Sequence, residues 1–175
     1  MEIAAEGLVD AGPGAVFTFL SDLENHWVLA DRFVELVSLE LREGAGDGGT
    51  VRLRGPFGLQ RTVSTRVGAV SPGQLAGSAE IGRRTRATLR WTLCPRGSGT
   101  TVRLSATVES LSRPDRLLLV AGGQRWLRGR FAATIQRLAD HLALENGRPR
   151  AAEAQAAGSE IHTSAPPLGT LTAPA

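Results

Sequence analysis

The feature that most constrains the fold is the order of periodic segments along the chain. A helix pattern at 13–27 follows one short strand pattern, and a longer helix pattern comes only at 113–145. Everything between them alternates as strands do. Helices near both ends, with an unbroken run of strands between them, predict a curved antiparallel sheet closed over a long helix. Such a sheet usually encloses a cavity, so this order indicates a ligand-binding protein more clearly than an enzyme.

The N-terminal part is expected to form a strand at 2–10 and then two short helices. Pro13 suits the first turn of a helix, and glycines flank it on both sides. One-sided helical spacing follows in Val16, Phe17, Phe19, Leu20 and Leu23. A second short helix is expected over 24–30.

Six further strands are expected between 33 and 108, which gives seven in all. Turns are predicted at GAGDGG (44–49), SPG (71–73) and PRGSG (95–99). The clearest half-buried strand alternates arginines and threonines with an inward set, namely Thr85, Ala87, Leu89, Trp91 and Leu93. Val102, Leu104, Ala106 and Val108 repeat the pattern on the next strand.

The long helix is predicted to begin after Ser112, which occupies an N-cap position. Its apolar stripe consists of Leu127, Phe131, Ile135, Leu138 and Leu142. Gly122 and Gly123 interrupt the helix and are expected to mark a kink.

The composition predicts one domain over 1–145 and a tail over 146–175. The tail has almost no large apolar residues and is expected to be disordered. Cys94 is the single cysteine, so no disulfide can form within the chain. The first ten residues lack the pattern of a leader, and no stretch is apolar enough to span a membrane. A cytoplasmic location is therefore expected.

Charge is segregated along the chain, with acids in 1–47 and arginines in 48–110. The isoelectric point of 10.7 overstates this, because the net charge is only +3 and the chain has neither lysine nor tyrosine. Pairing of acidic and basic strands within one sheet is the preferred interpretation, against a basic binding surface. Outward arginines without interleaved aromatic residues argue against nucleic-acid binding and leave weak contact with an anionic membrane surface as an option.

Two sequence words, FTFLSDLENHW at 17–27 and LRGRFAATIQRLADHL at 127–142, together with the order of elements, resemble the SRPBCC superfamily over about 2–145. This superfamily includes START-type lipid carriers and polyketide cyclase or dehydrase-like proteins, many of them bacterial. The resemblance implies an α+β helix-grip fold, in which a curved antiparallel sheet of about seven strands wraps around a long C-terminal helix, with two short helices after the first strand. It also implies an elongated apolar cavity between sheet and helix.

Known catalytic motifs are missing from the sequence. It contains no HExxH, Walker lysine, GxSxG or CxxC pattern. Its three histidines, His26, His141 and His162, lie on different predicted elements. No catalytic residue, metal or cofactor is therefore assigned.

The densest polar cluster is Asp22, Glu24, Asn25 and His26, followed by Trp27. In folds of the resembled type this helical corner lies near the cavity entrance, where His26 would serve as a base or a hydrogen-bonding group. The alternative is that Asp22 and Asn25 cap a helix end while Trp27 fills the core.

Arg61 is the second polar candidate, because it lies in phase with the apolar residues of its strand. A guanidinium pointing into the cavity would bind a carboxylate or phosphate. Glu35 is its expected partner if the arginine is paired within the protein instead. Thr65, Leu89, Trp91 and Leu104 are expected to share the cavity wall.

These observations predict a protein that binds a small hydrophobic ligand, with an acidic group as an option, in the cavity between sheet and helix. A polyketide cyclase or dehydrase-like enzyme, with His26 and Arg61 as its chemical groups, stays open. A protein-interaction module stays open as well.

Overall fold

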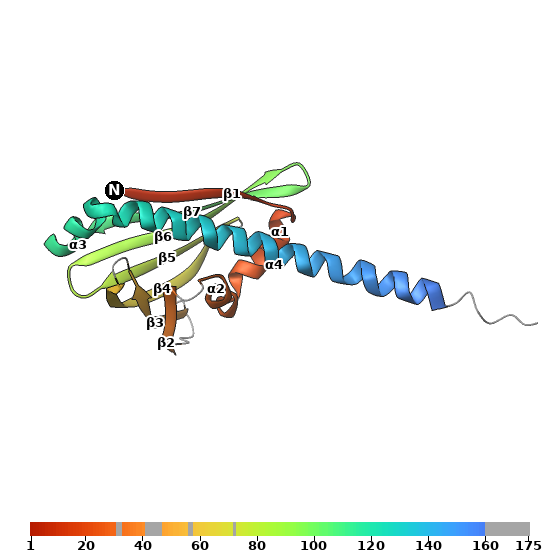
Figure 1. Cartoon of the computed structure of the whole chain (residues 1–175), viewed down its shortest axis with the longest axis horizontal. Helices are drawn as coiled ribbons and strands as arrows, with labels where there is room; N and C mark the ends of the chain where they lie inside the picture. The colour runs from red at the N-terminus through yellow and green to blue at the C-terminus, as the bar shows by residue number, and fades with distance from the viewer. Residues whose placement is uncertain (31–32, 41–46, 56–57, 72, 160–175) are drawn as a thin grey trace, which may run out of the picture. The chain divides into compact units, whose positions relative to one another are not determined.

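The computed structural model describes residues 1–30, 33–40, 47–55, 58–71 and 73–159 (Figure 1). Its strands are β1 (Glu2–Val9), β2 (Val34–Glu40), β3 (Asp47–Arg54), β4 (Gln60–Ser71), β5 (Gln74–Ile81), β6 (Thr85–Arg96) and β7 (Gly99–Ser110). Its helices are α1 (Pro13–Ser21), α2 (Leu23–Ala30), α3 (Arg113–Leu118), the π-helical turn η3 (Leu119–Gly123) and α4 (Gln124–Ser159). The expected strand and helix order is confirmed.

The strands form one seven-stranded antiparallel sheet in the order β1-β7-β6-β5-β4-β3-β2. Strands β2 to β7 follow one another as hairpins, and β1 pairs with the last strand, β7. The connection holding α1 and α2 therefore leads from one edge of the sheet to the other. Figure 1 shows both helices at one end of the strands and the part of α4 up to Ala143 running along the sheet. This is the helix-grip arrangement expected from the sequence.

The N-terminal helices begin and end where the local chemistry predicts. Pro13 occupies the first turn of α1, after Gly12 at the N-cap. Between α1 and α2, the Asp22 carboxylate accepts a hydrogen bond from the Glu24 backbone N–H (2.9 Å), and the Asn25 amide donates to the Phe19 carbonyl (2.9 Å). Asp22 and Asn25 therefore cap a helix end, as the alternative interpretation of this cluster predicted.

The kink before α4 is also confirmed. Ser112 caps α3 by accepting a hydrogen bond from the Asp115 N–H. Within η3, Gly122 has φ of 111° and ψ of −6°, outside the helical region. Glycine adopts this backbone conformation without the steric cost that a side chain would add. The chain thus changes direction between α3 and α4 at this residue.

The core lies where α1 and α4 pack on β1, β7 and β6. α4 contributes Phe131, Ile135, Leu138 and Leu142, all buried, which confirms most of the expected stripe. A Cβ atom on Gly7 of β1 would lie 2.8 Å from Cγ2 of Ile135, so helix and strand are in close contact there. The buried Thr100 hydroxyl donates to the Ala11 carbonyl (2.7 Å) and joins β7 to the start of α1.

The chain separates into two compact units, Met1–Ala143 and Leu144–Ala175. The expected boundary at 145/146 lies close to this division. α4 continues as helix to Ser159, while 160–175 lie outside the described residues, so the expected disorder of 146–175 stays a prediction. Alanine-rich sequence favours helix even without large apolar residues to pack. Among the described residues, none of the helices has both the length and the apolarity needed to cross a membrane.

Exposed ion pairs connect neighbouring strands of the sheet, and one of them, between Arg103 and Glu2, joins the basic and acidic parts of the sequence. Arg103 of β7 pairs with Glu2 of β1 at 2.9 Å, and Arg86 of β6 pairs with Glu80 of β5 at 2.8 Å. These are pairs between neighbouring strands, as the preferred interpretation of the charge pattern predicted.

A candidate ligand-binding cavity

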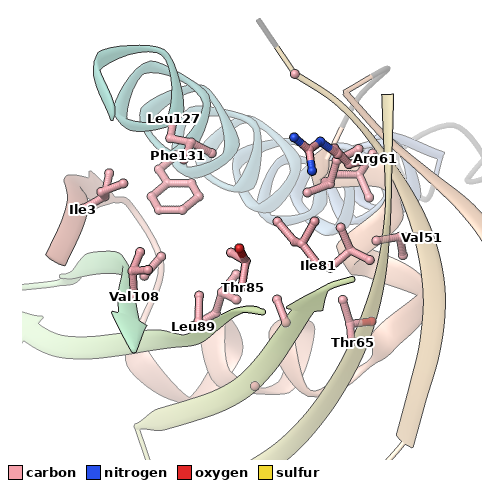
Figure 2. A pocket seen from close by; sticks show the side chains of 18 of the residues that line it. Ile3, Val51, Arg61, Thr65, Ile81, Thr85, Leu89, Val108, Leu127 and Phe131 are labelled. Carbon is pink, nitrogen blue, oxygen red and sulfur yellow. The ribbon is translucent and has the colours of Figure 1, made fainter. Parts of the chain in front are cut away.

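A cavity of about 360 Å³ lies in the first unit, between the inner face of the sheet and the segment from α3 to α4. Its size is within the ~300–1,000 Å³ range of small-molecule pockets. In Figure 2, Leu127 and Phe131 extend from the helix toward the sheet, where Leu89 and Val108 form part of the opposite wall. Aliphatic and aromatic side chains make up most of the lining. The cavity therefore suits an apolar molecule.

A polar cluster lies at the end of the cavity where β6 begins and α3 starts. Arg61 of β4 pairs with Asp115 of α3, with Nη2 and Oδ1 3.0 Å apart. The Thr85 hydroxyl donates to Oδ2 of Asp115 (2.5 Å), and the Ser112 hydroxyl donates to the same oxygen (2.6 Å). The carboxylate is thus bonded through both oxygens, and α3 is connected to β4 and β6.

Arg61 keeps hydrogen-bonding capacity after pairing with Asp115. Its side chain is 37% exposed, whereas that of Asp115 is 12% exposed. A guanidinium has five N–H donors, and within the described part of the chain Asp115 is the partner recorded for Arg61. Figure 2 shows the guanidinium extending from its strand toward the cavity. The remaining N–H groups can donate to a ligand carbonyl or carboxylate.

His26 lies at the other end of the inner face, beside Trp91. Its Nε2 is 2.6 Å from the Leu20 carbonyl oxygen, and its ring meets the Trp91 ring edge to face, with centroids 6.2 Å apart at 84°. Because a carbonyl only accepts, Nε2 carries the proton, and Nδ1 of the neutral ring is an acceptor. Burial lowers the pKa of His26, outweighing the hydrogen bond to Leu20 and the charge of Asp22, which both raise it. His26 is therefore neutral at pH 7.

Six of the eight residues predicted for the site lie on the cavity wall. These are His26, Arg61, Thr65, Leu89, Trp91 and Leu104. The Thr65 hydroxyl donates to the Gly49 carbonyl (3.2 Å), so it is already bonded within the sheet. The Trp27 side chain lies outside the described side chains.

The prediction for Glu35 is wrong. Its carboxylate pairs with Arg52 (3.5 Å) and Arg54 (3.6 Å), both from β3, with its side chain 48% exposed. The reason is the phase of β2, in which Val34 lines the cavity and a register shift between Leu36 and Ser38 interrupts the alternation. Glu35 therefore points outward, and Asp115 replaces it as the partner of Arg61.

Sequence reasoning missed Asp115 and Thr85 as polar site residues. Asp115 lies in the first turn of α3, next to the Ser112 cap, and Thr85 was predicted only as an inward strand residue. The sequence does indicate that a carboxylate lies near Arg61, because a charged side chain that points inward requires a countercharge. The strand phase favoured Glu35, whereas the carboxylate at the start of the covering helix satisfies the same requirement.

An aromatic cluster of Phe33, Trp126 and Arg130 connects the start of β2 to α4. The Phe33 and Trp126 rings meet edge to face with centroids 5.8 Å apart. The Arg130 guanidinium lies 5.3 Å from the Trp126 centroid and 5.9 Å from that of Phe33. Both aromatic residues also line the cavity. The cluster therefore closes part of the cavity wall through cation–π and ring contacts.

Comparison with known families gives a match over most of the chain. The family described as "Polyketide cyclase / dehydrase and lipid transport" matches residues 2–143. No curated protein sequence matches the chain.

Several solved structures share this fold. The protein TTHA0849 from Thermus thermophilus is 20% identical, with a TM-score of 0.66, covering 83% of this chain and 99% of that one. A START superfamily protein from Mycobacterium smegmatis is 17% identical, with a TM-score of 0.57, covering 81% of this chain and 98% of that one. DR_A0006 from Deinococcus radiodurans is 16% identical, with a TM-score of 0.55 and coverages of 83% and 99%. At these identities the likeness concerns the fold.

Proposed function

We propose that this chain, which belongs to the polyketide cyclase/dehydrase and lipid transport family, binds a small hydrophobic molecule in the cavity between its sheet and α4. The family match confirms the SRPBCC-type resemblance of the sequence. The observation that carries the proposal is a mostly apolar cavity of about 360 Å³.

Apolar burial would supply most of the binding free energy. Each 100 Å² of apolar surface removed from water contributes about 2.5 kcal/mol. A rigid wall adds to this, because Trp91 and Leu104 are buried in the core as well as lining the cavity. A preformed wall lowers the cost of ordering protein groups on binding.

The Arg61 end would orient the ligand. Because Asp115 already balances the charge of Arg61 at 3.0 Å, the cavity offers N–H donors there without a full net positive charge. A neutral carbonyl is therefore accommodated as well as a carboxylate. The acidic ligand predicted as an option from the sequence is therefore one of several ligands that could bind here, all of which carry a hydrogen-bond acceptor.

Binding is proposed rather than catalysis because the candidate chemical groups are far apart. Arg61 is joined through Asp115 to Thr85 at the start of β6, whereas His26 contacts Trp91, six positions further along that strand. At ~3.3 Å per residue this separation is about 20 Å along the strand. A base and an anion-stabilising group would both have to contact one reacting centre.

The proposal is tested by filling the cavity. Ala87 lines the cavity, while Arg90 on the same strand points outward. Native mass spectrometry after gentle purification, followed by denaturing extraction, should detect a bound apolar molecule with wild type and with Arg90→Phe but not with Ala87→Phe. In titrations with the naphthalene dye 8-anilino-1-naphthalenesulfonate, wild type and Arg90→Phe should bind the dye and Ala87→Phe should not.

Two results would contradict the proposal. Equal dye binding by all three proteins would place the binding site elsewhere, and absence of dye binding and of any extracted molecule from wild type would mean that the cavity is not a binding site. Circular dichroism and melting curves of each variant supply the control for folding.

A further inference from the structure

We propose that the cavity recognises both ends of its ligand, an elongated apolar molecule that carries a hydroxyl group at one end and a carbonyl or carboxyl group at the other. This inference rests on the proposed binding function and specifies the class of ligand. It comes from the opposite hydrogen-bonding character of two polar residues on the cavity wall, Arg61 and His26.

The Arg61 end donates hydrogen bonds. Both oxygens of Asp115 are occupied, by Arg61 on one side and by the Thr85 and Ser112 hydroxyls on the other. The Thr85 hydroxyl also accepts from the Ser112 N–H (3.0 Å). The unused groups of this cluster are therefore guanidinium N–H donors, which require an acceptor on the ligand.

The His26 end accepts a hydrogen bond. Its Nε2–H is bonded to the Leu20 carbonyl. In the described part of the chain Nδ1 has no hydrogen-bond partner, and no buried side-chain nitrogen or oxygen is left unsatisfied. Nδ1 is consequently accessible, on a residue that lines the cavity. A ligand hydroxyl would donate to it, whereas a carbonyl would place two acceptors against each other.

Along β6 the wall between the two ends is apolar. Ala87 and Leu89 occupy the inward positions of β6 between Thr85 and Trp91, and both line the cavity. The ends are about 20 Å apart along the strand, less the reach of the side chains. At ~30 Å³ per water-sized group, 360 Å³ accommodates roughly a dozen heavy atoms. A chain of about ten carbons with a polar group at each end fits both the distance between the two ends and the volume of the cavity.

The test compares ligands of one chain length by isothermal titration calorimetry with the full chain. The probes are 10-hydroxydecanoic acid, decanoic acid and 1-decanol. Wild type should bind the hydroxy acid about three- to tenfold more tightly than either probe with a single polar group, as expected for one additional hydrogen bond. This comparison needs no variant and so does not depend on folding of a mutant.

Matched variants assign each end. His26→Phe should remove the preference for the hydroxy acid over decanoic acid, and Arg61→Leu should remove its preference over 1-decanol. His141→Phe is the control, because His141 packs against Phe19 and does not line the cavity. It should retain both preferences.

The outcomes separate this inference from the binding function. Equal affinity of wild type for the hydroxy acid and decanoic acid would overturn recognition of two ends while leaving apolar binding in place. A preference that survives in His26→Phe would overturn the role of Nδ1. No binding of any probe, together with no effect of Ala87→Phe on dye binding, would overturn the binding function itself.

Discussion

The two halves of the sheet have similar alternating sequences but different environments on their inner faces. Over β1, β7 and β6 many inward side chains, such as Leu93 and Val102, belong to a continuous buried cluster with α1 and α4, and some of its members, such as Ile3, line the cavity as well. Among the described residues of β2, β3 and β4, none belongs to this cluster. Their inward residues, such as Val34 and Leu53, line the cavity instead. The same strand pattern thus builds the packed core together with part of the cavity wall in one half, and the rest of the cavity wall in the other.

The difference arises from what covers each half. Val16 and Leu20 of α1 and Leu138 of α4 are fully buried in the packed half. Above the cavity half the cover is α3, η3 and the start of α4, held by the Asp115 contacts to β4 and β6. A cavity forms where the covering element is connected through its polar groups rather than through interdigitated apolar side chains.

The largest expected effect comes from truncating a side chain in the packed half. Leu138→Ala should lower the free energy of unfolding by about 2–5 kcal/mol, because Leu138 is 0% exposed and its loss leaves a void. Leu53→Ala, on the cavity wall, should cost about 1 kcal/mol or less, because it only enlarges a space that already exists. Urea denaturation of both variants measures the difference. Equal losses would contradict the division into two halves.

The next effect concerns the polar attachment of the cover. Asp115→Asn should destabilise the fold by about 1–3 kcal/mol, because it removes the countercharge of Arg61 at the cavity wall. Glu35→Gln removes an acid from the exposed pairs with Arg52 and Arg54 and should cost less than about 1 kcal/mol. Thermal unfolding compares the two. A larger loss for Glu35→Gln would show that α3 is not held by Asp115.

A smaller effect is expected from the two glycines of the covering segment. Gly122→Ala should destabilise by about 1–2 kcal/mol, since alanine does not readily adopt φ of 111° although its Cβ would meet no atom within 4 Å. Gly129→Ala lies inside α4 with equally open surroundings and should stabilise by up to about 1 kcal/mol. Melting temperatures should therefore move in opposite directions. The same direction for both would mean that the kink is not required.

The smallest effect is the pH dependence from His26, which lines the cavity beside Trp91 of the packed half. Burial lowers its pKa in the folded chain below the ordinary 6.5, so the unfolded chain takes up the proton first. Stability is therefore complete above pH 6.5 and falls as the pH drops below it, until the folded His26 is also protonated. Urea midpoints at about pH 7.5 and about pH 5.5, on either side of the ordinary histidine pKa, should differ more for wild type than for His26→Phe. An equal change in both proteins would contradict this assignment.

Most of the fold followed from the sequence because strand alternation and helix caps are local signals. The inward sets of β6 and β7, the Ser112 cap and the Gly122 kink were all predicted from neighbouring residues. The partner of Arg61 could not be predicted in this way, because it depends on where α3 crosses the sheet. The prediction for Glu35 was wrong because β2 carries a register shift. A shift of one residue reverses the face of each side chain beyond it.

The register shift in β2 has a second consequence, for contacts between molecules. β2 is the last strand of the sheet, and Leu36 and Val37 on it are 39% and 51% exposed. An edge strand with apolar side chains is a template on which a strand of another chain can pair, which leads to aggregation. The bulge between Leu36 and Ser38 interrupts the row of backbone groups that such pairing requires. The irregularity that turns Glu35 away from the cavity therefore also limits growth of the sheet from one molecule to the next.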